Sequence, residues 1–137
     1  MTLIKSVLCA AALCVALPVQ AQSAKPPLRE VPEIADAIFV IVVANEIRRK
    51  CDDIDGRLLK GIGEIRRVRG RANELGYSDA EIRAVLDSKT EKALMIERGR
   101  SYMAGKGLDY DTPADLCRLG HIEIRENSAI GALLRAK

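Results

Sequence analysis

The sequence is poor in histidine and in aromatic residues. Its 137 residues include one histidine, one phenylalanine, three tyrosines and no tryptophan. One histidine is too few for a zinc site built from histidines, and so few aromatic rings speak against a platform on which single-stranded nucleic acid bases stack. The composition therefore excludes a histidine-built metal site and disfavours nucleic acid as a partner.

Long apolar runs are also missing, except at the N-terminus. There Lys5 precedes Ser6–Leu17, a stretch of 12 uncharged and mostly apolar residues, and small or modest side chains follow up to Ala21. This order is typical of a secretory signal peptide, and the run is shorter than the ~20 apolar residues of a membrane-spanning helix. We therefore predict a signal peptide at residues 1–21, cut between Ala21 and Gln22, and a periplasmic or secreted chain without stable membrane insertion. The alternative is an uncleaved membrane anchor.

Cleavage at that site removes two of the four cysteines. Cys9 and Cys14 lie in the signal peptide, whereas Cys51 and Cys117 remain in the exported chain. An even number of cysteines in an exported protein suggests one disulfide, because export takes the chain into an oxidising compartment. Two buried free thiols are the alternative. A catalytic dithiol is disfavoured because the mature sequence has no Cys-x-x-Cys motif.

The mature chain has the size and the pattern of one helical domain. Residues 22–31 contain Pro26 and Pro27 and predict an extended lead-in, and residues 32–137 form a single domain. In this domain apolar residues recur every three or four positions, and no stretch alternates with a period of two for long enough to be a strand. We predict an all-α fold, a compact bundle of five or six helices.

Two stretches indicate where the core lies. A first helix should begin at Pro32, and its segment Ile38–Ala44 is apolar on every side, which is typical of a helix at the centre of a domain. A second helix is expected from Asp53 to Leu75, with an apolar stripe from Leu58 to Leu75 at helical spacing. Ser78-Asp-Ala-Glu81 and Ser88-Lys-Thr-Glu91 are capping boxes that begin two further helices, and Thr112-Pro113 begins another.

Two acidic loops resemble calcium-binding loops but lack the required spacing. Aligning Gly56 with the sixth position of an EF-hand loop puts Cys51 at the first position and Ile62 at the twelfth, where Asp and Glu are required. The loop at Asp109–Asp111 fails in the same way. We therefore predict no metal site and no cofactor.

A basic run crosses the second expected helix. It consists of Arg66, Arg67, Arg69 and Arg71. A nucleic-acid patch is conceivable, but the chain is expected to be exported and its net charge is only +3. We interpret the run as a solvated helix face, with an acidic protein partner or an anionic surface as the alternative.

The candidate catalytic side chains lack a catalytic context. His121 is not accompanied by Gly-x-Ser-x-Gly or a similar nucleophile motif, so we expect it to pack or cap locally. Glu123 and Glu126 are neighbours on one helix surface, and nothing signals the apolar pocket that glycosidase carboxylates need. We predict no catalytic residues.

Several short motifs of the chain form a recognisable set. They are Ala44-Asn-Glu-Ile-Arg-x-x-Cys51, Leu75-Gly-Tyr-Ser-Asp-Ala-Glu-Ile82, Tyr102 followed by Gly105 and Gly107, Cys117-Arg-Leu-Gly120, Glu123-Ile124 and Ile130-Gly-x-Leu-Leu-Arg135. Together they resemble a family of small exported alphaproteobacterial proteins that is defined only as a domain of unknown function, and the similarity covers nearly all of residues 31–136. The resemblance implies a helical fold, export, pairing of Cys51 with Cys117, and no catalytic residues.

These observations favour a non-enzymatic periplasmic helical protein that acts through contacts with another periplasmic protein. A small periplasmic chaperone, stress protein or inhibitor is a related alternative, and a carboxylate-based hydrolase is the alternative of a different class. An exposed apolar patch of roughly several hundred Å² would favour a binding protein. A deep pocket lined by carboxylates with raised pKa values would favour the hydrolase.

The expected cleavage gives a prediction about processing. Protein recovered from the periplasm should begin at Gln22, because signal peptidase cuts after the small residue Ala21. Intact-mass measurement of the recovered protein tests this. A species that still carries Met1–Ala21 would contradict it.

Overall fold

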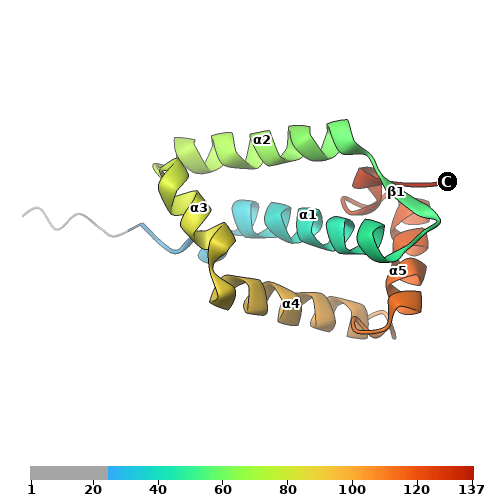
Figure 1. Ribbon diagram of the computed structural model, residues 1–137. Helices are drawn as coiled ribbons and strands as arrows, with labels where there is room; N and C mark the ends of the chain where they lie inside the picture. The colour runs from blue at the N-terminus through green and yellow to red at the C-terminus, as the bar shows by residue number, and fades with distance from the viewer. Residues whose placement is uncertain (1–24) are drawn as a thin grey trace, which may run out of the picture.

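In the computed structural model, which describes residues 25–137, one helix lies in the middle of the others (Figure 1). This helix is α1, Pro32–Lys50. The other helices are α2 (Leu58–Glu74), α3 (Asp79–Asp87), α4 (Lys89–Ala104) and α5 (Pro113–Glu126). The predicted helical fold is confirmed, whereas the predicted signal peptide and its cleavage site at Ala21–Gln22 lie outside the described residues. Among the residues described, no helix is both long enough and apolar enough to span a bilayer.

The main core lies between α1 and the two helices that follow late in the chain. Phe39, Val43 and Ile47 of α1 share one buried cluster with Met103 of α4 and Leu119 of α5. These α1 residues are spaced four apart, so they lie on one face of the helix. Pro32 stands in the first turn of α1, where its missing N–H leaves no helical bond unmade.

A second, smaller cluster joins the start of the described chain to α2 and α3. Leu28 and Ile34 pack there with Val68, Ala72 and Tyr77. Leu28 is buried because Leu28–Glu30 forms a 3₁₀ turn, named η1, which folds it inward. This turn interrupts the extended lead-in that the sequence predicts for residues 22–31.

Two short strands correct the expectation of an entirely helical chain. β1 (Ile54–Gly56) pairs antiparallel with β2 (Leu134–Ala136), and Ile54 lies opposite Ala136. The second helix consequently begins at Leu58 and not at Asp53. Strands of three residues are too short to show an alternating pattern, and what holds them is the burial of Ile54 and Leu134 in the main cluster. A second 3₁₀ turn, η2 (Gly131–Leu133), leads into β2.

Side-chain caps begin two of the helices, α3 and α4. The first capping box is complete, because the Glu81 amide donates to Ser78 Oγ at 3.2 Å and the Ser78 amide donates to the Glu81 carboxylate at 2.7 Å. The second is half formed. Ser88 Oγ accepts from the Glu91 amide at 3.3 Å, whereas the Glu91 carboxylate binds Arg29 at 2.5 Å.

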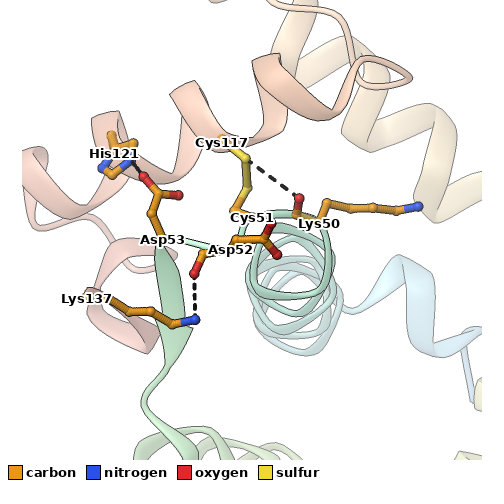
Figure 2. The surroundings of a disulfide bond; sticks show 7 residues. All are labelled: Lys50, Cys51, Asp52, Asp53, Cys117, His121 and Lys137. Carbon is orange, nitrogen blue, oxygen red and sulfur yellow. Dashed lines mark hydrogen bonds and ion pairs between the residues drawn. A yellow bond between two sulfur atoms is a disulfide. The ribbon is translucent and has the colours of Figure 1, made fainter.

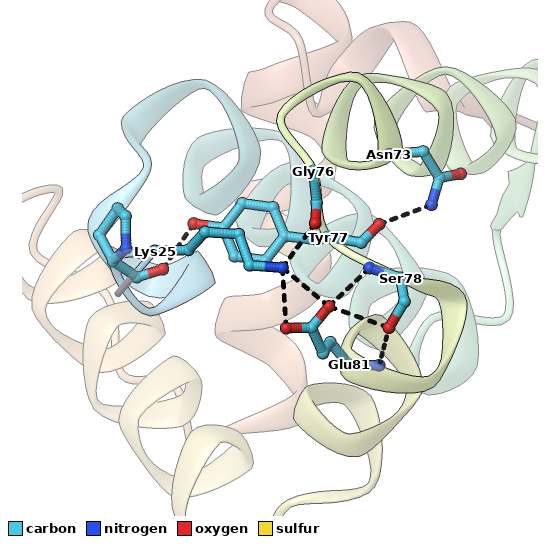
Figure 3. A network of polar contacts seen from close by, with 7 residues as sticks. Lys25, Asn73, Gly76, Tyr77, Ser78 and Glu81 are labelled. Atoms are coloured by element: carbon cyan, nitrogen blue, oxygen red, sulfur yellow. Dashed lines mark hydrogen bonds and ion pairs between the residues drawn. The ribbon is translucent and has the colours of Figure 1, made fainter. Parts of the chain in front are cut away.

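The corner between α2 and α3 also holds the first described residues (Figure 3). Lys25 Nζ donates to the Gly76 carbonyl oxygen at 2.5 Å and to the Glu81 carboxylate at 3.0 Å, and Tyr77 donates its hydroxyl to the Pro26 carbonyl oxygen at 2.5 Å. The Ser78 amide, Lys25 and the Ser78 hydroxyl lower the pKa of Glu81 to about 2. Gly76 turns the chain there with φ of +88°, a conformation that favours glycine.

The low pKa of Glu81 predicts a loss of stability in acid that Glu81→Gln should remove. The ordinary pKa of a glutamate is 4.5, so the charged carboxylate stabilises the fold above that pH and this contribution is lost as the pH falls toward about 2. The melting midpoints of wild type and variant should therefore differ near neutral pH and converge between about pH 5 and about pH 2.

Thermal melts followed by circular dichroism measure this convergence. Glu30→Gln is a matched control, since Glu30 is an exposed carboxylate whose described ion pair, with Arg29, spans 3.8 Å. A constant difference between wild type and Glu81→Gln across the acid range would contradict the assignment.

Candidate functional site

The predicted disulfide is present and joins the end of α1 to α5 (Figure 2). Cys51 follows directly after α1 and is buried, and Cys117 lies in the second turn of α5. Their Cα atoms are 5.4 Å apart, within the ~4.4–6.8 Å usual for a disulfide, and they are separated by 66 residues in the chain. The alternative of two free thiols is therefore wrong.

The single histidine lies beside this disulfide. His121 Nε2 is 2.7 Å from a carboxylate oxygen of Asp53, and this hydrogen bond lowers the pKa of Asp53 (Figure 2). Cys117, one turn earlier on α5, is held in the disulfide and supplies no free thiol beside His121. The contact joins α5 to the segment before β1, which is the local role expected for His121.

The carboxylates of the two acidic loops contact different partners and do not converge on one point. Asp53 contacts His121, and Asp55 contacts Arg135 at 3.5 Å and Lys137 at 3.6 Å. In the second loop, Asp111 forms an ion pair with Arg100 at 3.0 Å. Within residues 25–137, no three His, Cys, Asp or Glu side chains converge as metal ligands.

Most of the basic run on α2 is neutralised by carboxylates. Arg67 binds Glu64, Arg69 binds Asp79 at 2.8 Å, and Arg71 binds Glu33 at 2.9 Å and Glu74 at 3.0 Å. These hydrogen bonds raise the pKa of all three guanidinium groups. Arg66 is the member of the run without an ion pair among the described residues. The run therefore ties α2 to α1 and α3 and is not an open basic patch.

The expectation that Glu123 lies on a helix surface is wrong, because its side chain is fully buried. The Tyr102 hydroxyl donates to Oε1 of Glu123 at 2.5 Å, Lys106 Nζ lies 3.4 Å from the same oxygen, and the Ser128 hydroxyl donates to Oε2. Burial and the Glu123 carboxylate raise the pKa of Tyr102 to about 12. Glu126 stays exposed.

The burial of Glu123 has a sequence signal. Leu116, Leu119, Gly120 and Glu123 fall at helical spacing on the buried face of α5. A carboxylate on such a stripe needs partners, and here both of its oxygens have them. None of the cavities along α1 described below is lined by Glu123. The cluster therefore joins α4, α5 and the segment after α5, and it is poorly placed for chemistry on a substrate.

An apolar groove runs along α1, and we call it the α1 groove. Its lining includes Ile38, Ile41 and Val42 of α1, Ile62 and Ile65 of α2, and Leu86 of α3. It consists of adjoining cavities of about 350, 250 and 150 Å³. The first two share Ile41 and Ile65, and the last two share Ile38, Val42 and Leu86.

The α1 groove corrects two expectations about the core. Ile38–Ala44 is not buried throughout, because Ile38, Ile41 and Val42 are only half-buried. The first half of the α2 stripe is mostly exposed, with Leu58 at 73% and Ile65 at 53%. A helix that is apolar on every side gives no signal of which side the fold leaves open, so periodicity could not locate the groove.

The disulfide generates a prediction about stability. In the chain-entropy model a bridge across 66 residues stabilises the fold by roughly 4 kcal/mol, and measured values span roughly 2–5 kcal/mol. Reduction, or the double variant Cys51→Ala/Cys117→Ala, should lower the melting midpoint by about 10 °C or more while leaving the helices formed at low temperature. Circular-dichroism melts with and without reductant measure the shift. Equal midpoints, or two titratable thiols in untreated protein, would contradict it.

Comparison with known proteins identifies the family of this chain. No curated protein and no solved structure matches the chain. The model of a family of unknown function, DUF5333, matches residues 26–135, which include the five α-helices of the described residues and both cysteines of the disulfide. The chain therefore belongs to this family of unknown function.

Proposed function

We propose that this protein is an exported, non-enzymatic helical protein that binds another protein in its α1 groove. The observation that carries the proposal is the open apolar side of α1. A helix that is hydrophobic on every side is expected to be covered on every side. In α1, one side is covered only in part, by the walls that α2 and α3 form.

Exposed apolar side chains extend this surface beyond the half-buried floor. Seven large hydrophobic residues of the described chain are exposed, and four of them, Leu58, Ile62, Ile65 and Leu86, line the α1 groove. Single exposed hydrophobic residues are common on soluble proteins, whereas a contiguous group marks an interaction site. A partner that covers them gains the free energy of apolar burial.

The expected location supports the proposal and restricts the partner. The signal peptide predicted at residues 1–21 and the Cys51–Cys117 disulfide both suit a protein that works in the periplasm or outside the cell. A partner would then be found in the same compartment.

The two alternatives receive different support. The hydrolase hypothesis considers paired carboxylates such as Glu123 and Glu126, and the two oxygens of Glu123 are already occupied by Tyr102, Lys106 and Ser128. A chaperone also needs an open apolar surface, so the α1 groove suits that alternative as well. A chaperone binds many unfolded chains and suppresses their aggregation, whereas a specific binding protein retains one partner.

The test is the variant Ile65→Glu, which places a charge in the wall of the α1 groove. Ile65 is 53% exposed, so the change should leave the melting midpoint nearly unaltered. Covering a large aliphatic side chain is worth ~1.5–3 kcal/mol, so we expect a partner captured from periplasmic extract to bind Ile65→Glu about ten-fold or more weakly.

Leu94→Glu is the matched control. Leu94 is 49% exposed on α4 and lines none of the three cavities of the groove. Capture that is lost in Ile65→Glu and retained in Leu94→Glu supports the proposal. Capture that is equal in both variants contradicts it, and suppression of the aggregation of unrelated proteins by wild type would favour the chaperone alternative.

A further inference from the structure

We infer that the occupant of the α1 groove is an amphipathic helix of the partner protein that carries carboxylates at both of its ends. This inference rests on the proposed function, because it names the kind of segment that the groove binds. The shape of the groove and the charges at its two ends carry it.

The shape of the groove suits a helix. Its floor is a continuous helix face, on which Ile34, Ile38, Ile41 and Asn45 follow one another at steps of three and four. The lining of the groove extends along α1 from Ile34 to Arg48, which spans about 21 Å at the rise of an α-helix. A partner helix about four turns long, with apolar residues at the same spacing on one face, would lie along this floor between the walls of the groove.

Cations without ion pairs lie at both ends of the groove. Arg48 and Arg57 line the end beside Leu58, and Lys92 lines the end beside Leu28. None of the three forms an ion pair with another described residue, and Arg48 donates only to the amide oxygen of Asn45, at 3.0 Å.

The carboxylates of the groove are already engaged. Asp55 contacts Arg135 and Lys137, and Glu91 binds Arg29 at 2.5 Å. The surface that a partner meets is therefore apolar in the middle and positive at each end. A helix with an apolar stripe and terminal carboxylates is complementary to it, and such charges favour the right partner over wrong ones.

A second copy of this chain does not meet these requirements. In a symmetric pair, the groove of each copy would face the same groove of the other. Parallel docking would place Arg48 and Arg57 against themselves, and antiparallel docking would place them against Lys92. Either arrangement brings like charges together without a free carboxylate between them.

A lipid chain is also a poorer fit than a helix. Pockets for small apolar ligands enclose most of the surface of the ligand. The walls of the α1 groove leave it open, since Ile65 and Leu86 are each 53% exposed. A single alkyl chain would stay in contact with water along the groove, whereas a helix is wide enough to contact both walls at once.

The test is a selection of helical peptides on the full mature chain, residues 22–137. A displayed library of about 15-residue helices carries leucine at i, i+3, i+4 and i+7, with random residues at both ends. Wild type should enrich Asp and Glu at both ends. The inference is overturned if no helix is enriched, or if the ends show no acidic preference.

Charge-removing variants test the contacts at one end. A selected acidic peptide should bind Arg48→Gln/Arg57→Gln about five-fold or more weakly than wild type, with a difference that shrinks as salt is added. Arg125→Gln is the control, because Arg125 is an exposed cation on α5 that lines none of the three cavities. Equal loss in both variants would mean that net charge, and not the end of the groove, attracts the peptide.

Two further measurements distinguish a helix from the other possible occupants of the α1 groove. Palmitate or anionic phospholipid vesicles that displace the peptide from wild type, and fail to bind Ile65→Glu, would identify the groove as a lipid site. If the captured partner remains sensitive to Ile65→Glu while the selection shows no acidic preference, the proposed function stands and the inference fails. If capture is insensitive to Ile65→Glu, the proposed function fails.

Discussion

The middle of the central helix α1, Ile38–Ala44, is apolar on every side and needs cover on every side, and the arrangement of this fold follows from that need. The α1 side that carries Phe39, Val43 and Ile47 is covered by α4 and α5. The start of α1 is covered by η1, α2 and α3 through the cluster around Leu28 and Ile34. The side that carries Ile38, Ile41 and Val42 is flanked by α2 and α3, which cover it only in part. The α1 groove is therefore a side of α1 that the chain covers only in part.

The two ends of the molecule are specified by different forces. Around Glu123, a buried carboxylate is stabilised only because Tyr102, Lys106 and Ser128 supply partners for both of its oxygens. The approach there is so close that a Cβ on Gly131 would lie 2.0 Å from the Glu123 carbonyl oxygen, so that position requires glycine. At the other end, apolar contacts and the corner of Lys25 and Glu81 hold α2 and α3. The bonds at the first end are made by a buried carboxylate, whereas those that Lys25 makes at the other end are exposed.

Sequence patterns located the parts of this fold that depend on local chemistry. Pro32 begins α1, Ser78 begins α3, and the count of cysteines left after residues 1–21 pointed to the pair that forms the disulfide. Features that depend on the tertiary arrangement could not be predicted from such patterns. β1 and β2 are too short for a pattern, the burial of Glu123 depends on residues 21 positions away at Tyr102, and the open side of α1 depends on which helices pack against it. The ion pairs that neutralise Arg69 and Arg71 likewise join separate elements.

The position of the disulfide also bears on how the chain finds its fold. The contacts between α1 and α5 join residues far apart in sequence, and such contacts slow folding because a long loop must close before they form. Once Cys51 and Cys117 are joined, the end of α1 and the start of α5 are neighbours along the covalent chain, and α2, α3 and α4 become a closed loop between them. The oxidised chain thus begins to fold with one long-range pairing, across 66 residues, already made. An oxidising compartment then acts on the folding rate of this protein as well as on its stability.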